Sequence, residues 1–108
     1  MPRITRAEEQ IVIKVIAATL LAGHRITVGD QEAVLVTNSV DSAQIMAAIA
    51  DTDQCEFDVI RHDGYCIGSI YFIFGSEWRK NVITDYTTSV EDLLDSAGVP
   101  ATQFTEVR

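Results

Sequence analysis

Two carboxylates, Glu56 and Asp58, stand two residues apart in a run that alternates between apolar and polar side chains. In a β-strand, which rises about 3.3 Å per residue, they share one face and lie about 7 Å apart, within the separation found in inverting glycosidases. A chain with 16 acidic residues among 108 contains such pairs by chance, and no neighbour is expected to raise the pKa of either acid. We therefore expect no general acid/base pair and no enzymatic activity.

A metal or cofactor site is also not predicted. Asp51 and Asp53 give the Asp-x-Asp start of a calcium-binding loop, but Cys55 stands where the third ligand belongs, and the glycine that follows in such loops is missing. His24 and His62 are isolated, so a zinc site lacks ligands. The glycines form neither common nucleotide-binding fingerprint, and we expect no cofactor.

The two cysteines predict neither a disulfide nor a nucleophile. The strand register described below places Cys55 and Cys66 on the core face but about 20 Å apart, too far for a disulfide. His62 projects from the opposite face, so it cannot activate Cys66. We expect both thiols to be buried, because free cysteine behaves as a small hydrophobic residue.

A β-hairpin around Asp63-Gly64 is predicted to position these side chains, because this dipeptide is typical of two-residue turns. Such a turn fixes which residues lie opposite one another and which face each side chain occupies. On the face assigned to water or a partner, the pairs are His62 with Tyr65, Ile60 with Ile67, Asp58 with Ser69, and Glu56 with Tyr71. On the core face they are Arg61 with Cys66, Val59 with Gly68, Phe57 with Ile70, and Cys55 with Phe72, followed by Phe74.

Hydrophobic periodicity and capping residues outline the remaining elements. Thr5 and Glu8 form a capping box before the first helix, and Asp41 and Ser89 are placed to begin the second and third. Helices are predicted over 5–23, 41–51 and 89–98, strands over 25–28, 32–37, 55–62, 66–74 and 82–86, and a loose tail over 99–108. The order α-β-β-α-β-β-β-α predicts one α+β domain over residues 1–108, with an antiparallel five-stranded sheet and helices packed on one face.

The net charge of −8 argues against two classes of partner. Non-specific nucleic-acid binding requires a positive surface, and anionic membranes repel an acidic chain. The longest apolar stretch, 11–22, is shorter than the roughly 20 residues that a membrane-spanning helix needs. We expect a cytoplasmic protein without direct nucleic-acid or membrane binding, and a basic protein is the partner that this charge favours.

Carboxylates mixed with aromatic residues form the candidate binding surface. Glu56 and Asp58 point out from the predicted sheet, Tyr71 lies beside Glu56, Asp85 is on the neighbouring strand, and Trp78 is in the preceding turn. Such a mixture suits the docking of arginine and lysine side chains. We predict that these residues bind a basic partner, as an anti-CRISPR or toxin-immunity protein would, although an ordinary solvated sheet face has the same polarity.

A second hypothesis concerns the first predicted helix, whose second half is apolar on almost every side. The residues responsible are Ile11, Val12, Ile13, Val15, Ile16, Leu20 and Leu21. Such a helix is buried on more than one face, by the sheet and a loop or by a second subunit. The alternative function is therefore a structural homodimer assembled through this helix.

The segment that contains Phe74-Gly75 and the run VITDYTTSVE at 82–91 resembles a pattern in small uncharacterised acidic proteins of bacterial phages and plasmids. The rest of the chain resembles them in outline, and residues 76–78 depart from the short Asn/Asp turn of that pattern. The resemblance implies a mobile-element origin and favours an inhibitor of host defence, but it implies no site residues. Locally, we expect Asp85 and Thr87 to bond to nearby backbone and Ser89 to cap the third helix.

Overall fold

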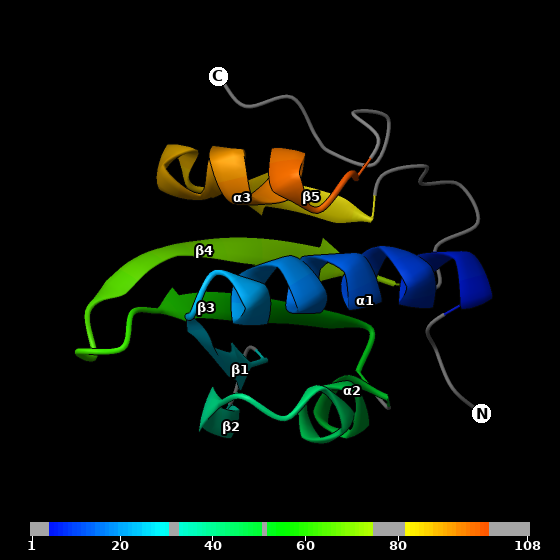
Figure 1. The fold of residues 1–108 in the computed structure, drawn as a ribbon. Coiled ribbons are helices and arrows are strands. Elements are labelled where there is room, and N and C mark those ends of the chain that lie inside the picture. The colour runs from blue at the N-terminus through cyan, green and yellow to red at the C-terminus, as the bar shows by residue number, and fades with distance from the viewer. Residues whose placement is uncertain (1–4, 31–32, 51, 75–81, 100–108) are drawn as a thin grey trace.

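The computed structural model describes residues 5–30, 33–50, 52–74 and 82–99, so Trp78 and nearly all of the predicted tail lie outside the described residues. Within these residues, three α-helices, five strands and a short 3-10 helix follow one another in the predicted α+β order (Figure 1). The elements are α1 (Arg6–Leu21), β1 (Arg25–Gly29), β2 (Val34–Ser39), α2 (Ser42–Ile49), β3 (Gln54–Ile60), β4 (Cys66–Ile73), β5 (Ile83–Tyr86), η1 (Thr88–Val90) and α3 (Glu91–Ser96).

The predicted capping box fixes the start of α1. The Thr5 hydroxyl accepts a hydrogen bond from the Glu8 amide at 3.2 Å, and the Glu8 carboxylate accepts one from the Thr5 amide at 2.8 Å. The helix ends before Gly23, whose φ of 87° lies in the left-handed region that glycine tolerates best. None of the described helices is long and apolar enough to cross a membrane.

The five strands form one antiparallel sheet in the order β2-β1-β3-β4-β5. As predicted, β3 pairs with β4 and β5 returns beside β4. The pairing of β1 with β3 brings Gly29 opposite Glu56. The helices pack on one face of the sheet, with α1 lying across it between α3 and α2 (Figure 1).

The core lies between this layer of helices and the sheet. Val12, Val15 and Ile16 of α1 are fully buried against the inward side chains of the strands. Phe57 of β3 and Phe72 of β4 are diagonal neighbours on the core face, with ring centroids 4.8 Å apart in an edge-to-face arrangement. The other buried strand residues of the core are Ile26, Val28, Cys55, Val59, Ile70 and Ile83, flanked by Phe74 and Val82.

The β3–β4 connection differs from the predicted two-residue turn. The Arg61 amide donates to the Tyr65 carbonyl at 2.8 Å, and the Gly64 amide donates to the Arg61 carbonyl at 2.8 Å, so the loop has three residues rather than two. Gly64 has a φ of 93°, the left-handed conformation that such loops require at their third position.

An irregularity in β4 restores the predicted register beyond this loop. Ile60 lies opposite Cys66 instead of the predicted Ile67, but Val59 lies opposite Gly68 as predicted. Ile67 is therefore the extra residue of a β-bulge, and the bulge offsets the extra residue of the loop. All predicted pairs from Val59 back to Cys55 are confirmed. The prediction that Cys66 is buried is wrong, because it lies at the irregular end of the strand and is exposed.

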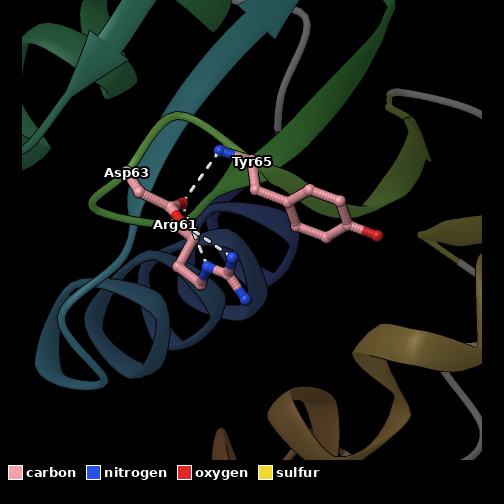
Figure 2. Close-up of polar contacts among 3 residues, drawn as sticks. All are labelled: Arg61, Asp63 and Tyr65. Carbon is pink, nitrogen blue, oxygen red and sulfur yellow. Dashed lines mark hydrogen bonds and ion pairs between the residues drawn. The ribbon is translucent and has the colours of Figure 1, made fainter.

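Asp63 explains why the loop adopts this shape (Figure 2). Its carboxylate accepts hydrogen bonds from Nε and Nη2 of Arg61 at 3.0 and 2.7 Å, and from the Tyr65 amide at 3.1 Å. The Arg61 guanidinium also lies 4.8 Å from the centre of the Tyr65 ring. The hydrogen bonds from Arg61 and then from the Tyr65 backbone hold the pKa of Asp63 well below its usual range. Arg61 thus interacts within the loop and is exposed. The prediction that Arg61 lies on the core face is wrong.

Close packing against Gly68 attaches the segment after β5 to the sheet. The Thr87 hydroxyl accepts from the Ser69 amide at 3.1 Å, and the Ser89 hydroxyl donates to the Ile67 carbonyl at 2.7 Å. A Cβ atom at Gly68 would collide with both hydroxyls. The predicted capping role of Ser89 is therefore wrong: Ser89 lies in η1, and α3 begins without a side-chain cap.

Candidate functional site

The sheet face opposite the helices carries the predicted binding residues that the structure describes. Glu56 of β3 lies opposite Tyr71 of β4, and Tyr71 lies opposite Asp85 of β5, so the three form one row across neighbouring strands. Asp58 lies in the next row, opposite Ser69. We call Glu56, Asp58, Tyr71 and Asp85 the acidic face; the fifth predicted residue, Trp78, lies outside the described residues.

The position of Asp58 is fixed by the neighbouring strand. The Ser69 hydroxyl donates a hydrogen bond to Oδ1 of Asp58 at 2.7 Å. On the other side, Thr27 of β1 lies opposite Asp58, but its hydroxyl is engaged with the side chain and amide of Asn38. Asp58 is therefore held by β4, in a fixed position beside Glu56.

Glu56 has an unusual protonation equilibrium. A hydrogen bond with the side chain of Asp58, partial burial and the negative charge of Asp58 together raise the pKa of Glu56 to about 7, against a smaller opposing effect from the Tyr71 hydroxyl. The expectation that no neighbour would raise the pKa of this acid is wrong, because Asp58 does so. At neutral pH the Glu56 carboxyl is divided between its neutral and its charged form.

The same contact argues against the hydrolytic chemistry considered for this pair. Glu56 interacts directly with the side chain of Asp58, although the strand rise sets their backbone positions about 7 Å apart. Inverting glycosidases need a wider gap, because a water molecule must fit between the base and the sugar. A direct interaction between the two carboxyl groups does not match that arrangement.

An open pocket of about 430 Å³ adjoins the acidic row. Its volume lies in the range of small-ligand sites. Acidic groups reach it from three strands or their ends, because Asp30 follows β1, Glu56 belongs to β3 and Asp85 to β5. None of its lining residues in the described part of the chain carries a positive charge. The lining residues are Asp30, Gln54, Cys55, Glu56, Tyr71, Phe72, Ile73, Thr84 and Asp85.

Asp30 is the acidic lining residue that sequence reasoning missed. Its carboxylate accepts a hydrogen bond from the Ala33 amide at 2.8 Å in the loop between β1 and β2. It reaches the pocket because β1 pairs with β3, which brings Gly29 opposite Glu56. Hydrophobic alternation along each strand does not reveal which strands are neighbours, so only the sheet order could have identified Asp30.

The described residues offer neither a metal site nor an activated thiol. No group of three or more His, Cys, Asp or Glu residues among them could hold a metal ion. Burial raises the pKa of the Cys55 thiol to about 12, which leaves it protonated and unreactive. Partial burial, followed by the negative charge of Asp58, also raises the pKa of the exposed Cys66 thiol. Both cysteines are free.

Comparison of the chain with protein-family models, with curated proteins and with solved structures found no match. The chemical interpretation of the acidic face and its pocket therefore depends on the geometry described above.

Proposed function

We propose that this protein is a non-catalytic interaction module and that its acidic face binds a basic protein. The observation that carries this proposal is the row of Glu56, Tyr71 and Asp85 across three strands, with Asp58 beside it, on the sheet face opposite the helices. Carboxylates bind arginine and lysine through charge-assisted hydrogen bonds, and an exposed tyrosine adds contact area and a face for a cation. A rigid sheet holds these groups in place before binding.

The pocket beside the row supplies a place for one basic side chain of the partner. A guanidinium or ammonium group there would meet the carboxylates of Asp30, Glu56 and Asp85 and the ring of Tyr71. An arginine suits this site better than a lysine, because its planar group can bind a carboxylate through two hydrogen bonds and stack on the ring. Binding energy at protein interfaces is concentrated in such anchors.

The class of partner follows from the same chemistry. Proteins that handle nucleic acids have basic channels, and an acidic sheet face competes for such a channel by presenting negative charge. An anti-CRISPR or toxin-immunity protein acts in this way, and the resemblance of 74–91 to phage and plasmid proteins favours this reading. A cytoplasmic location, where such partners act, is part of the proposal.

The test is recovery of a partner from host-cell lysate at low salt. Substituting lysine for Glu56 and Asp58 together should abolish recovery, because the partner then meets like charges. The matched control is Asp95→Lys, which changes an exposed charge at the end of α3 in the helical layer. Recovery by the wild type should also fall as salt is added, because salt screens exposed charges.

Equal recovery by the double variant and the wild type would remove the acidic face from consideration. The single variant Asp85→Lys, on a different strand, extends the test to the far end of the row. Circular dichroism and denaturation curves of each variant separate loss of binding from loss of folding.

One observation favours the second candidate function, a homodimer assembled through α1. The inward side of α1 is covered by the sheet, but Ile13 and Leu21 remain 47% and 90% exposed. Large apolar side chains so exposed on one helix are candidates for contact with another subunit. Light scattering over a range of concentrations tests this.

A further inference from the structure

The outward side of α1 carries an apolar stripe. Ile13, Ala17 and Leu21 are exposed, and their spacing of four residues places them along one side of the helix. The inward side, with Val12, Val15 and other buried residues, packs on the sheet. The helix therefore has two apolar sides, and one of them is covered within the described chain.

The charges along this helix are compatible with a second copy of the chain. The protein has a net charge of −8, so two copies repel each other over most of their surface. From Gln10 to Leu21, however, α1 contains one charged residue, the exposed Lys14, and that charge is positive. This is a surface on which two acidic copies can meet with little repulsion.

The ends of the helix favour an antiparallel arrangement. The last turn of α1 contains no basic residue, so no lysine or arginine of the helix itself offsets the partial negative charge at its C-terminus. If two copies of α1 cross antiparallel with Ala17 at the twofold axis, Ile13 of each copy packs on Leu21 of the other. The same register brings Lys14 of each copy beside the C-terminal turn of the other. The small side chain of Ala17 lets the two helices approach closely at the centre.

We propose that two copies of this protein pack antiparallel through Ile13, Ala17 and Leu21 of α1 to form a dimer with an acidic face on each outer side. Glu56 and Asp58 alternate along β3 with core residues that pack toward α1, so the acidic face lies on the other side of the sheet, and α1 pairing leaves both acidic faces uncovered and pointing away from each other. The dimer itself rests on the proposed homodimer through α1. Its ability to hold two basic partners rests on the proposed binding of a basic protein by the acidic face. Two linked sites bind a partner with repeated basic surfaces more tightly than one site does.

Sedimentation equilibrium from about 1 to about 200 µM tests the dimer without any partner. We expect a dimer in the wild type, and Ile13→Lys should weaken it at least about tenfold, because a buried charge would replace an apolar contact. The control is Val34→Lys on β2, which changes an exposed apolar residue on a different element and should leave the dimer intact. Lys14→Glu should also weaken it, by placing a negative charge beside the partner's helix C-terminus.

A cross-link gives the second measurement. Ala17→Cys in a Cys66→Ser background leaves Cys55 as the other thiol, and Cys55 is buried. Under mild oxidation we expect a rapid disulfide between the two copies, whereas Val34→Cys in the same background should form little. A monomer throughout the concentration range, with no more cross-linking at 17 than at 34, would overturn the proposal. Binding of a basic partner by single copies would remain measurable in that case, so failure of the dimer and failure of the acidic face can be told apart.

Discussion

Glu56 and Asp58, two residues apart on one face of β3, are joined by a hydrogen bond that raises the pKa of Glu56 to about 7. The ordinary pKa of a glutamate is near 4.5, so the folded protein holds this proton more tightly than the unfolded chain does. The free energy of unfolding therefore depends on pH between these two values.

The first prediction concerns this dependence. Because the folded pKa is raised, the stability that the Glu56 proton provides is fully present below about 4.5 and is lost as the pH rises through about 7. Glu56→Gln keeps a hydrogen-bond donor but cannot ionise, so this loss should disappear. At pH 8 we expect the variant to be more stable than the wild type by about 1 kcal/mol, a figure reduced for solvent screening of a partly exposed group. Urea denaturation at several pH values measures it.

The control for this effect is Asp95→Asn, which removes an exposed carboxylate from α3. The difference in free energy of unfolding between this variant and the wild type should not change as the pH rises from about 4.5 to about 7. A Glu56→Gln effect of the same size at pH 5 and pH 8 would show that Glu56 does not share a proton with Asp58.

The second prediction concerns Gly68, where backbone packing is tightest. Gly68→Ala should cost about 2 kcal/mol, because its Cβ would displace the Thr87 and Ser89 hydroxyls from their hydrogen bonds to β4. Gly29→Ala is the matched control, since a Cβ there meets one atom, the Ala33 carbonyl oxygen, at an ordinary 3.5 Å. Denaturation curves should show a clear loss for the first variant and a small change for the second. Equal losses of stability in the two variants would mean that replacing any strand glycine is destabilising, and that the contact of Gly68 with Thr87 and Ser89 adds nothing.

The third prediction separates backbone conformation from contacts at the hairpin loop. Gly64 has a φ of 93°, and a Cβ at this position would meet no other atom. Gly64→Ala should therefore cost about 1 kcal/mol through conformation alone. Gly64→Asn should cost less, because asparagine tolerates the left-handed region better than alanine does. The reverse ranking in a thermal or urea denaturation series would contradict the three-residue loop.

The fourth prediction concerns the two thiols. In the native protein a thiol reagent such as Ellman's reagent should modify Cys66, which is exposed, whereas Cys55 should react only after unfolding, because it is buried. The reaction at Cys66 should be slow near pH 7 and should accelerate with pH, because its pKa is raised. Cys66→Ser should abolish the native reaction. A second thiol that reacts rapidly in the folded state would contradict the burial of Cys55.

Local patterns in the sequence predicted those parts of the fold that depend on near neighbours. Thr5 and Glu8 form the predicted capping box, and Asp41 caps α2 by accepting from the amides of Ala43 and Gln44. The alternation along β3 and β4 correctly placed Phe57 and its neighbours inside and Glu56 outside. These features follow from side-chain periodicity and from hydrogen bonds within one turn of helix or one hairpin.

Features that depend on distant segments were not predictable in the same way. Ser89 is a residue type that commonly caps helices, but its hydroxyl donates a hydrogen bond to the Ile67 carbonyl of β4 instead. The proximity of Asp30 to Glu56 requires the β1–β3 pairing, which no local pattern encodes. The raised pKa of Glu56 likewise depends on a side-chain contact that strand spacing alone does not reveal.

The bulge at Ile67 and the three-residue loop after Arg61 together have a consequence for how this chain can change in length. The longer loop shifts the β3–β4 register by one residue, and the bulge shifts it back by one. The two shifts offset each other before the paired residues of the core begin at Val59 and Gly68. A deletion at the tip could therefore be absorbed by straightening β4, with every side chain beyond Val59 keeping its present side of the sheet. The tip can vary in length while the carboxylates keep their positions, so it is the natural place to attach a label or a peptide tag without disturbing either face.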